Sequence, residues 1–351
     1  MDQDEQGLQV GYRQTLLYGF LAFLLIAAVS AFYFFVIRGQ ETVFAKNKNS
    51  VAVSDSIVHA SVSVPAGSVA DTGPDLQKKG ADILFVGDMF FDRHIRQVGE
   101  AQGGNYIFSC IDPLLQKPDF VVGNLEGPIT SNASVSVGSV VGSANNYRFT
   151  FPTSTAALLR AHGVQVVTLG NNHITNFGLS GLLQTHAYLD QVGVGYFGGV
   201  AGNEPVYRKD DGGVPLSFVG YNQFGGASPA QVALTILGER AAGRVVIVFA
   251  HWGTEYSTTT EQTRPIATLF AESGASVVIG SHPHVVGVHE YIGSTLVYYS
   301  LGNFIFDQYF NAAVTHGLAL LLHVAQTGEV AASEYPTELE RDGRTCPQRL
   351  Q

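Results

Sequence analysis

Short apolar runs recur along the chain and alternate with longer segments whose apolar positions follow a helical spacing. The runs predict buried strands at residues 83–86, 120–122, 166–169, 245–250 and 277–279. The helical segments, each followed closely by a glycine, are residues 153–162, 181–192 and 261–273. Strands that alternate with helices predict an α/β fold.

The pattern changes after residue 284. Residues 285–292, 295–300 and 317–324 read as consecutive strands, with a tight turn at residues 292–294. Strands joined by tight turns pair in antiparallel fashion, so we predict a mixed sheet. Residues 131–146 are rich in Ser, Gly, Val and Asn and predict a surface loop, either passive or placed over a site.

The N-terminal part has a pattern of its own. Residues 15–37 contain no charged side chain and would span roughly 34 Å as a helix, enough for a bilayer core. We predict an uncleaved transmembrane anchor; a signal peptide cleaved near residues 27–31 and a buried soluble helix are the alternatives. The predicted parts are a tail (1–14), the anchor (15–37), a flexible stalk (38–79), a folded domain (80–335) and a C-terminal tail (336–351).

The charged residues limit the classes of possible partner but do not fix the orientation of the chain in a membrane. A formal net charge of -10 without a run of Lys or Arg argues against a nucleic-acid partner. Arg13 precedes the apolar span, whereas Arg38, Lys46 and Lys48 follow it, which by the positive-inside rule places the folded domain in the cytoplasm. Large domains cross membranes largely regardless of such charges, so the charges alone leave the orientation open.

Two cysteines, Cys110 and Cys346, are too few for a disulfide framework or a thiolate metal site. A single bridge between them, formed outside the cytoplasm, and two unpaired thiols are both compatible with the sequence.

Polar motifs follow the predicted strands. They are Gly87-Asp88, Asn124-Leu125-Glu126, Gly170-Asn171-Asn172-His173, His251-Trp252-Gly253 and Gly280-Ser281-His282-Pro283-His284. Ligand sites of open α/β sheets lie outside the carboxyl ends of the strands, where these motifs would converge. The motifs therefore predict a metal site.

Each motif alone has an ordinary structural explanation. Asp88 can cap a helix, His251 can be a hydrogen-bonded core histidine, and Asn124 can be a turn residue. The pair His282 and His284 is harder to explain in this way, because residues i and i+2 of an extended segment point to the same side.

The expected ligands are carboxylate, amide and imidazole groups without a thiolate. This set suits one or two divalent ions of Mn, Fe, Zn or Mg. A carboxylate that bridges two ions gives the geometry of two-metal hydrolysis, and a neighbouring imidazole can protonate the leaving group.

The same motifs, in this order and followed by the block Tyr-Ser-Leu-Gly-Asn-Phe-Ile-Phe-Asp at residues 299–307, resemble the CapA family of bacterial capsule and poly-γ-glutamate synthesis proteins. The resemblance covers about residues 80–335. It implies a metallophosphatase-like layered sandwich of the calcineurin-like superfamily, with mixed β-sheets flanked by helices. Many members of the family have an N-terminal anchor that holds the domain outside the cytoplasmic membrane, so we expect a single-pass protein with its domain outside the cytoplasm.

The resemblance also implies a role for each motif residue. The metal ligands would be Asp88, Glu126, Asn172, His251, His282 and His284. His173 would contact the substrate and act as general acid. The expected substrate-binding or supporting groups are Arg93, Asn124, Glu255 and Asn303. Arg93 suits an anionic group best, because its planar fork matches phosphate and carboxylate.

Three positions depart from the family pattern. Phe90 stands where metallophosphatases usually have a metal-binding histidine, so the first metal loses a ligand unless Asp92 or a water completes its shell. Glu126 is one methylene longer than the usual bridging aspartate, and Asn176 replaces a common aspartate.

We therefore expect a membrane-anchored, CapA-like protein that takes part in the synthesis or export of a capsule or poly-γ-glutamate. As a metal-dependent hydrolase it would act on phosphoester bonds or, as the second choice, amide bonds. The alternative is a non-catalytic, metal-containing scaffold subunit of an anionic-polymer synthase. The expected partners are the membrane, an anionic polymer or phosphoester substrate, and other membrane subunits of the synthase.

Overall fold

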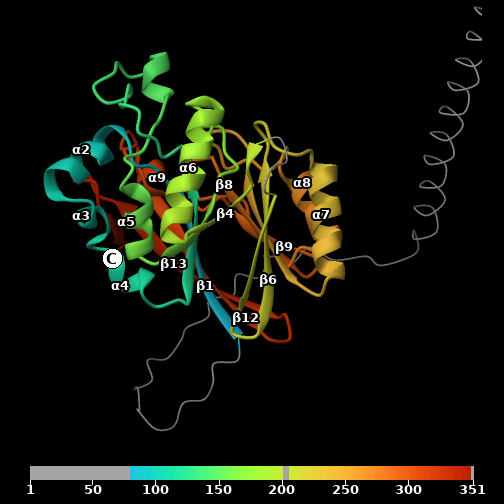
Figure 1. Cartoon of the computed structure of the whole chain (residues 1–351). Coiled ribbons are helices and arrows are strands. Elements are labelled where there is room, and N and C mark those ends of the chain that lie inside the picture. The colour runs from blue at the N-terminus through green and yellow to red at the C-terminus, as the bar shows by residue number, and fades with distance from the viewer. Residues whose placement is uncertain (1–79, 201–204, 349–351) are drawn as a thin grey trace, which may run out of the picture. The chain divides into compact units, whose positions relative to one another are not determined.

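Two β-sheets lie face to face, and helices cover the outer face of each (Figure 1). The computed structural model describes residues 80–200 and 205–348, which all belong to the unit Pro74–Gln351. The prediction of mixed sheets flanked by helices is confirmed. The predicted tail, anchor and stalk lie outside the described residues, and within the described ranges no helix is long and apolar enough to cross a membrane.

The first sheet has eight strands in the order β14-β13-β12-β1-β2-β3-β4, and β11 pairs with β1. Their bounds are β1 (Gly80–Met89), β2 (Phe120–Leu125), β3 (Val164–Thr168), β4 (Gly195–Phe197), β11 (Asn303–Ile305), β12 (His316–Ala325), β13 (Val330–Leu339) and β14 (Thr345–Pro347). Strands β1 to β4 are parallel, whereas β12 runs antiparallel to β1. The carboxyl ends of four strands therefore lie at one edge of the sheet.

The second sheet has six strands in the order β5-β6-β7-β8-β10-β9. They are β5 (Val206–Asp211), β6 (Val214–Asn222), β7 (Val245–His251), β8 (Val277–Ser281), β9 (His289–Ile292) and β10 (Thr295–Tyr298). Strands β6, β7, β8 and β10 are parallel, and β5 and β9 are antiparallel edges. The tight turn predicted at residues 292–294 joins β9 to β10, as expected.

Strand β1 shows why the central strands are apolar throughout. Ile83 and Phe85 pack in the layer between the sheets, where the ring of Phe85 lies 6.1 Å from that of Phe218. Leu84 and Val86 point the other way and pack under the helices. Both faces of the strand are buried, so the sequence loses the polar alternation of a strand with one solvent face.

The helices cover the outer faces of the two sheets. The first sheet carries α2 (Arg93–Gln102), α3 (Asn105–Phe108), α4 (Asp112–Leu115), α5 (Thr155–Ala161) and α6 (Gly178–Val192). The second carries α7 (Pro229–Ala241) and α8 (Arg264–Glu272). Within residues 80–200 and 205–348 there are also two short helices, a 3₁₀ turn (Ala144–Tyr147) and α9 (Ala312–Thr315).

The helices predicted at residues 153–162, 181–192 and 261–273 are confirmed as α5, α6 and α8, whereas helices α2 and α7 and strand β6 were not predicted. A signal for α7 was present in the sequence. The Ser228 hydroxyl accepts from the backbone of Gln231 and the Gln231 side chain accepts from the backbone of Ser228, with Pro229 at the first helical position.

The C-terminal boundary differs from the prediction. Strand β13 continues past residue 335 in register with β12, and β14 adds a further strand to its edge. The segment expected to be a tail therefore belongs to the first sheet up to Pro347, because its backbone completes the hydrogen bonds of the sheet edge.

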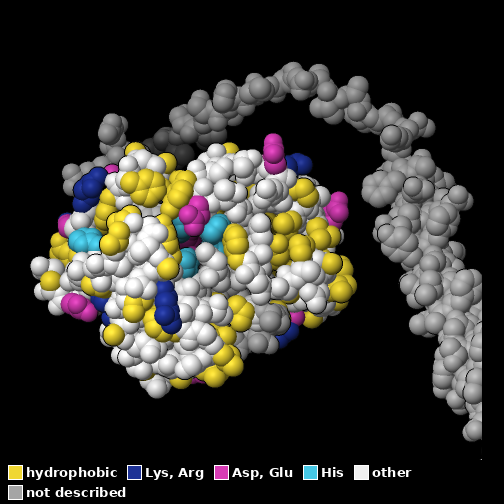
Figure 2. All heavy atoms as spheres, turned by 90° about the horizontal axis from the view of Figure 1, so that it is seen from above, with side chains coloured by type: hydrophobic (Ala, Val, Ile, Leu, Met, Phe, Trp, Pro, Cys, Tyr) yellow, Lys and Arg dark blue, Asp and Glu magenta, His cyan; other side chains and the backbone are white. Residues whose placement is uncertain are grey.

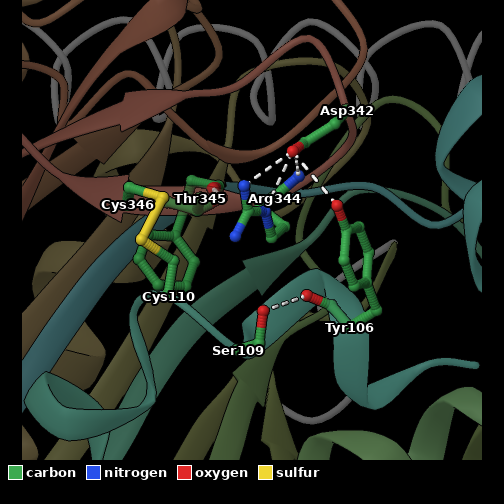
Figure 3. Close-up of a disulfide and its surroundings, with 8 residues drawn as sticks. Tyr106, Ser109, Cys110, Asp342, Arg344, Thr345 and Cys346 are labelled. Carbon is green, nitrogen blue, oxygen red and sulfur yellow. Dashed lines mark hydrogen bonds and ion pairs between the residues drawn. A yellow bond between two sulfur atoms is a disulfide. The ribbon is translucent and has the colours of Figure 1, made fainter. Parts of the chain in front are cut away.

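A disulfide between Cys110 and Cys346 joins β14 to the segment between α3 and α4 (Figure 3). The two Cα atoms are 4.9 Å apart. Asp342 lies beside the bridge and accepts hydrogen bonds from Tyr106 and Arg344. Of the two alternatives that the sequence left open, the structure has the bridge.

Candidate metal centre

The polar motifs meet at the carboxyl ends of the parallel strands. In the first sheet Asp88 pairs with Asn124 on one side and with Asn303 on the other. In the second sheet His251 pairs with Ser281. The backbone N–H of His282 donates to Asp88 Oδ2 at 3.2 Å, so the motifs of the two sheets are in contact.

Two motif glycines stand where the backbones approach too closely for a side chain. A Cβ at Gly87 would overlap the carbonyl oxygen of Gly302, and one at Gly280 would overlap that of Tyr299. Glycine at these two positions therefore lets the ligand-bearing segments converge.

Asp88, Glu126 and His251 form a buried group that could hold a metal ion. Each offers one ligand atom, and these atoms lie within 4.8 Å of one another. The amide of Asn124 donates to Asp88 Oδ1 at 2.7 Å and also to Glu126 Oε2. One buried amide thus holds two carboxylates side by side.

The residues present fit a cation. Glu126 Oε1 and His282 Nδ1 are buried and have no hydrogen-bond partner. Burial, and after it the charge of Asp88, raises the pKa of Glu126 well above its usual range. A divalent ion would give the unpartnered atoms a ligand role and would favour the ionised form of Glu126. A set of oxygen and imidazole donors suits Mn, Fe, Zn or Mg.

Polar neighbours contact both ring nitrogens of His251. Its Nδ1 lies 2.9 Å from Ser281 Oγ, and its Nε2 lies 2.8 Å from Asn172 Oδ1 and 3.6 Å from Glu126 Oε1. Burial, followed by the charges of neighbouring histidines, lowers the pKa of His251 well below its usual value. The imidazole is therefore neutral, which is the form that binds metals.

His282 and His284 lie on a tight turn and not on an extended segment, so that part of the prediction is wrong. Their φ angles are 95° and 57°, in the left-handed region. The turn places their ring centroids 6.1 Å apart and brings His282 to 4.8 Å from the ring of His251. Burial, and secondly His284, lowers the pKa of His282 to about 4.

Asn303 fixes the proton of His284. Its Nδ2 faces the carbonyl oxygens of Val314 at 3.0 Å and of His284 at 3.4 Å, and Gln308 Oε1 at 3.2 Å. Its Oδ1 therefore faces His284 Nδ1 at 2.9 Å, with Asp88 Oδ2 a further 3.3 Å contact of the same nitrogen. An amide oxygen only accepts, so Nδ1 carries a proton, and Nε2 is the nitrogen that the neutral imidazole would offer to a metal.

His173 lies at the side of the cluster. Its ring packs 4.2 Å from that of Phe149, and its Nδ1 lies 3.2 Å from Asn176 Oδ1. Burial lowers the pKa of His173 to about 4, so it is a neutral imidazole at neutral pH.

Phe90 fills the position of the usual histidine ligand, and Asp92 does not compensate for it. The ring of Phe90 stacks on Phe306 with the centroids 4.6 Å apart. Both oxygens of Asp92 are engaged elsewhere, since Oδ1 accepts from Arg96 at 2.9 Å and Oδ2 accepts from the Thr150 N–H at 2.9 Å. The suggestion that Asp92 completes the metal shell is therefore wrong.

Arg93 and Glu255 border the cluster in different ways. The guanidinium of Arg93 lies 4.6 Å above the Phe90 ring and is paired through both branches of its fork with Asp307, at 2.5 and 3.1 Å. An anionic substrate would have to compete with Asp307 for it. Glu255 is exposed on the loop after β7, and its charge is a minor cause of the raised pKa of Glu126.

Asn171 and Ser281 support the cluster, although no role was predicted for either residue. Asn171 Nδ2 donates to Asn124 Oδ1 at 3.0 Å and to the Leu125 carbonyl at 2.7 Å, which fixes the amide between the two carboxylates. Both residues belong to the polar motifs at the strand ends, so their positions pointed to the site. The spacing of a motif does not reveal which of its polar residues supports another.

Figure 2 shows how the site opens to the surface. Histidine and acidic side chains gather in a hollow near the middle of this face, and hydrophobic side chains border it. The buried cluster is therefore reached from the end of the molecule at which the strands of both sheets finish.

The fold and the site together define a two-sheet α/β sandwich with a candidate metal centre at the strand ends. Residues 82–308 match the family described as "Bacterial capsule synthesis protein PGA_cap", and the chain belongs to this family. The predicted resemblance to CapA proteins is confirmed.

Two relatives in the genus Bacillus show the same likeness. The chain is 28% identical over 258 residues to "PGA biosynthesis protein CapA" of Bacillus subtilis (strain 168). This match covers 67% of this chain and 66% of that protein. It is 27% identical over 251 residues to "Capsule biosynthesis protein CapA" of Bacillus anthracis. This second match covers 64% of this chain and 60% of that protein. The similarity thus spans less than two thirds of each relative.

Proposed function

We propose that the chain is a metal-dependent hydrolase of phosphoester bonds that acts in the synthesis or export of a capsule polymer. The buried group of Asp88, Glu126 and His251 carries this proposal, because two buried carboxylates beside a neutral imidazole call for a cation. The family of capsule synthesis proteins and the names of the two Bacillus relatives support the biological setting.

The residues that would hold the ion are Asp88, Glu126, Asn172, His251, His282 and His284. When bound, a divalent ion supplies positive charge for a phosphoester oxygen and lowers the pKa of a water. His173 stands at the side as a neutral imidazole. An anionic phosphoester beside it would favour the imidazolium and raise its pKa, so that His173 can pass a proton to the leaving oxygen.

We further propose that the folded domain works outside the cytoplasm, held by the anchor at residues 15–37, beside other membrane subunits of a polymer synthase. The bridge between Cys110 and Cys346 supports this location, because disulfides persist in oxidising compartments. Nucleic acid stays excluded from the proposed partners on the ground of the net charge of -10.

The test measures bound manganese and hydrolysis of bis(p-nitrophenyl) phosphate by the purified full chain. Wild type is expected to bind the metal and to turn over. His251→Ala should lose metal and activity together, whereas His173→Ala should keep the metal and lose about 100-fold or more in rate. His289→Ala on β9, a half-exposed histidine outside the cluster, is the matched control and should change neither.

Two outcomes would contradict parts of the proposal. Failure of wild type to bind a divalent ion would remove the metal centre. Metal binding without turnover, with polymer production unchanged in His173→Ala cells, would favour the scaffold alternative. The scaffold alternative is supported by Phe90, which stands where metallophosphatases usually have a metal-binding histidine.

A further inference from the structure

Two aromatic side chains stand exposed at the edge of the candidate metal centre. Phe224 lies between β6 and α7 and is 42% exposed, and Tyr256 lies on the loop after β7 and is 45% exposed. The ring of Phe224 is 4.3 Å from that of His282, and the ring of Tyr256 is 6.0 Å from that of His284. Each ring therefore borders an imidazole of the cluster while part of its surface stays open to solvent.

The backbone at Phe224 is tied to the metal-centre segments. Its N–H donates to Asn222 Oδ1 at 2.9 Å, and Asn222 Nδ2 in turn donates to the Asn171 carbonyl at 3.2 Å. The ring also lies 5.8 Å from that of His251. These contacts fix where Phe224 stands relative to the cluster.

Tyr256 is held at both of its ends. Its N–H donates to the Pro283 carbonyl at 2.8 Å, and its hydroxyl accepts from Gln308 Nε2 at 3.1 Å. Its φ of 61° is left-handed, a conformation that a residue with a side chain keeps only where its surroundings enforce it. The edge of Phe310 packs against the ring at 5.1 Å.

Arg93 and Arg148 are both already partnered. Arg93 is paired with Asp307, and Arg148 donates to the Asn176 carbonyl at 3.1 Å while its guanidinium covers the Phe177 ring at 4.5 Å. The partly exposed rings of Phe224 and Tyr256 are therefore available to a ligand at the edge of the site.

We propose that Phe224 and Tyr256 form a ring-binding subsite, and that the substrate is a phosphoester whose organic group carries a ring that stacks on them. Aromatic side chains bind the faces of bases and other rings without needing a charge, which matches a border of this kind. The inference rests on the proposed phosphoester chemistry, for which the cluster would hold the phosphorus end and the two aromatic residues the organic end.

Equilibrium binding of two phosphonates to the manganese-loaded full chain tests this subsite. Phenylphosphonate and methylphosphonate carry the same anionic head and differ in the ring, and neither has a phosphoester bond that could be hydrolysed. We expect wild type to bind the phenyl compound about tenfold more tightly. Phe224→Leu and Tyr256→Leu should each bring this ratio down several-fold, while Phe224→Tyr should keep it.

Tyr291→Leu is the matched control. Tyr291 is 66% exposed on β9, outside the metal centre, and its replacement should leave the ratio unchanged. Equal binding of the two phosphonates by wild type, or a ratio that survives both leucine variants, would overturn the subsite. Binding of neither compound would overturn it as well.

The readouts separate this inference from the proposed hydrolase. Turnover of bis(p-nitrophenyl) phosphate without a phenyl preference would support the proposed hydrolase and contradict the subsite. A phenyl preference without turnover would support the subsite and contradict the proposed hydrolase. Methyl phosphate, uridine 5′-phosphate and glucose 1-phosphate, bound to the His173→Ala chain, then distinguish the two sources of a ring. Tighter binding of the uridine compound assigns a base, tighter binding of the glucose compound assigns a sugar, and no gain over methyl phosphate for either would contradict the proposed substrate class.

Discussion

At the residue scale, neutral side chains organise the candidate metal centre. Asn124 bridges the carboxylates of Asp88 and Glu126, Asn303 orients His284, and Ser281 contacts His251. Each contact holds a candidate ligand in a fixed orientation. The partners of the ligands, as well as the ligands themselves, therefore set the affinity of such a site.

Ser281→Ala tests this support. Nδ1 of His251 would lose its 2.9 Å partner, so the imidazole could turn and change tautomer. We expect the affinity for manganese to fall by about 10-fold, with the fold retained, as measured by metal titration.

Ser273→Ala at the end of α8 is the matched control, because its hydroxyl donates to the Leu269 carbonyl away from the cluster. Unchanged affinity in Ser281→Ala would show that the strand pairing alone orients His251.

At the element scale, a buried carboxylate links α7 to the second sheet. Glu239 on α7 accepts from Arg208 of β5 and from Ser217 Oγ of β6 at 2.5 Å. The hydrogen bond from Arg208 is the main reason why the pKa of Glu239 lies below its usual value. A group with a lowered folded-state pKa stabilises the fold above its unfolded pKa, which is about 4.3 for glutamate.

Glu239→Gln should therefore cost stability at neutral pH and less in acid. The stabilisation is fully present above about pH 4.3 and is lost as the pH falls through the lower folded-state pKa. Because Arg208 is half exposed and screened by solvent, we expect a Tm loss of only about 2–4 °C at pH 7.

The difference in Tm from wild type should shrink towards pH 3 in thermal melts. Glu272→Gln, at an exposed glutamate of α8, serves as the comparison. A difference that is constant with pH would mean that packing, and not the ionised carboxylate, is responsible.

At the scale of the whole molecule, the C-terminal strand is fastened to the first helices. The bridge between Cys110 and Cys346 joins positions 236 residues apart in sequence. Closing so long a loop restricts the unfolded chain strongly, while the folded strand β14 is already paired with β13. The C-terminal segment is thus part of the folded unit that carries the site.

Replacing both cysteines with serine should lower the free energy of unfolding by about 3–5 kcal/mol. Urea unfolding of the oxidised protein measures the loss, and wild type treated with a reductant should show the same shift. Identical midpoints for oxidised wild type and the double variant would show that the bridge does not form in solution.

The sequence by itself determined most strands of the core and the positions of the polar motifs, although it did not reveal the buried strand β6. Central strands such as β1 are buried on both faces, so their apolar runs are visible without any tertiary information. The motif order also identified the family. Helix α2 escaped prediction because Ile95 is its one buried residue, which leaves little apolar periodicity to detect.

Only the tertiary structure decided how these parts serve a site. His282 and His284 lie on a left-handed turn, which is a matter of backbone angles. Arg93 pairs with Asp307, which is far away in sequence, and Arg96 engages Asp92. The same holds for the exposed rings of Phe224 and Tyr256. Local sequence pattern records which side chains are polar or apolar, whereas the partners of each polar group follow from how the two sheets meet.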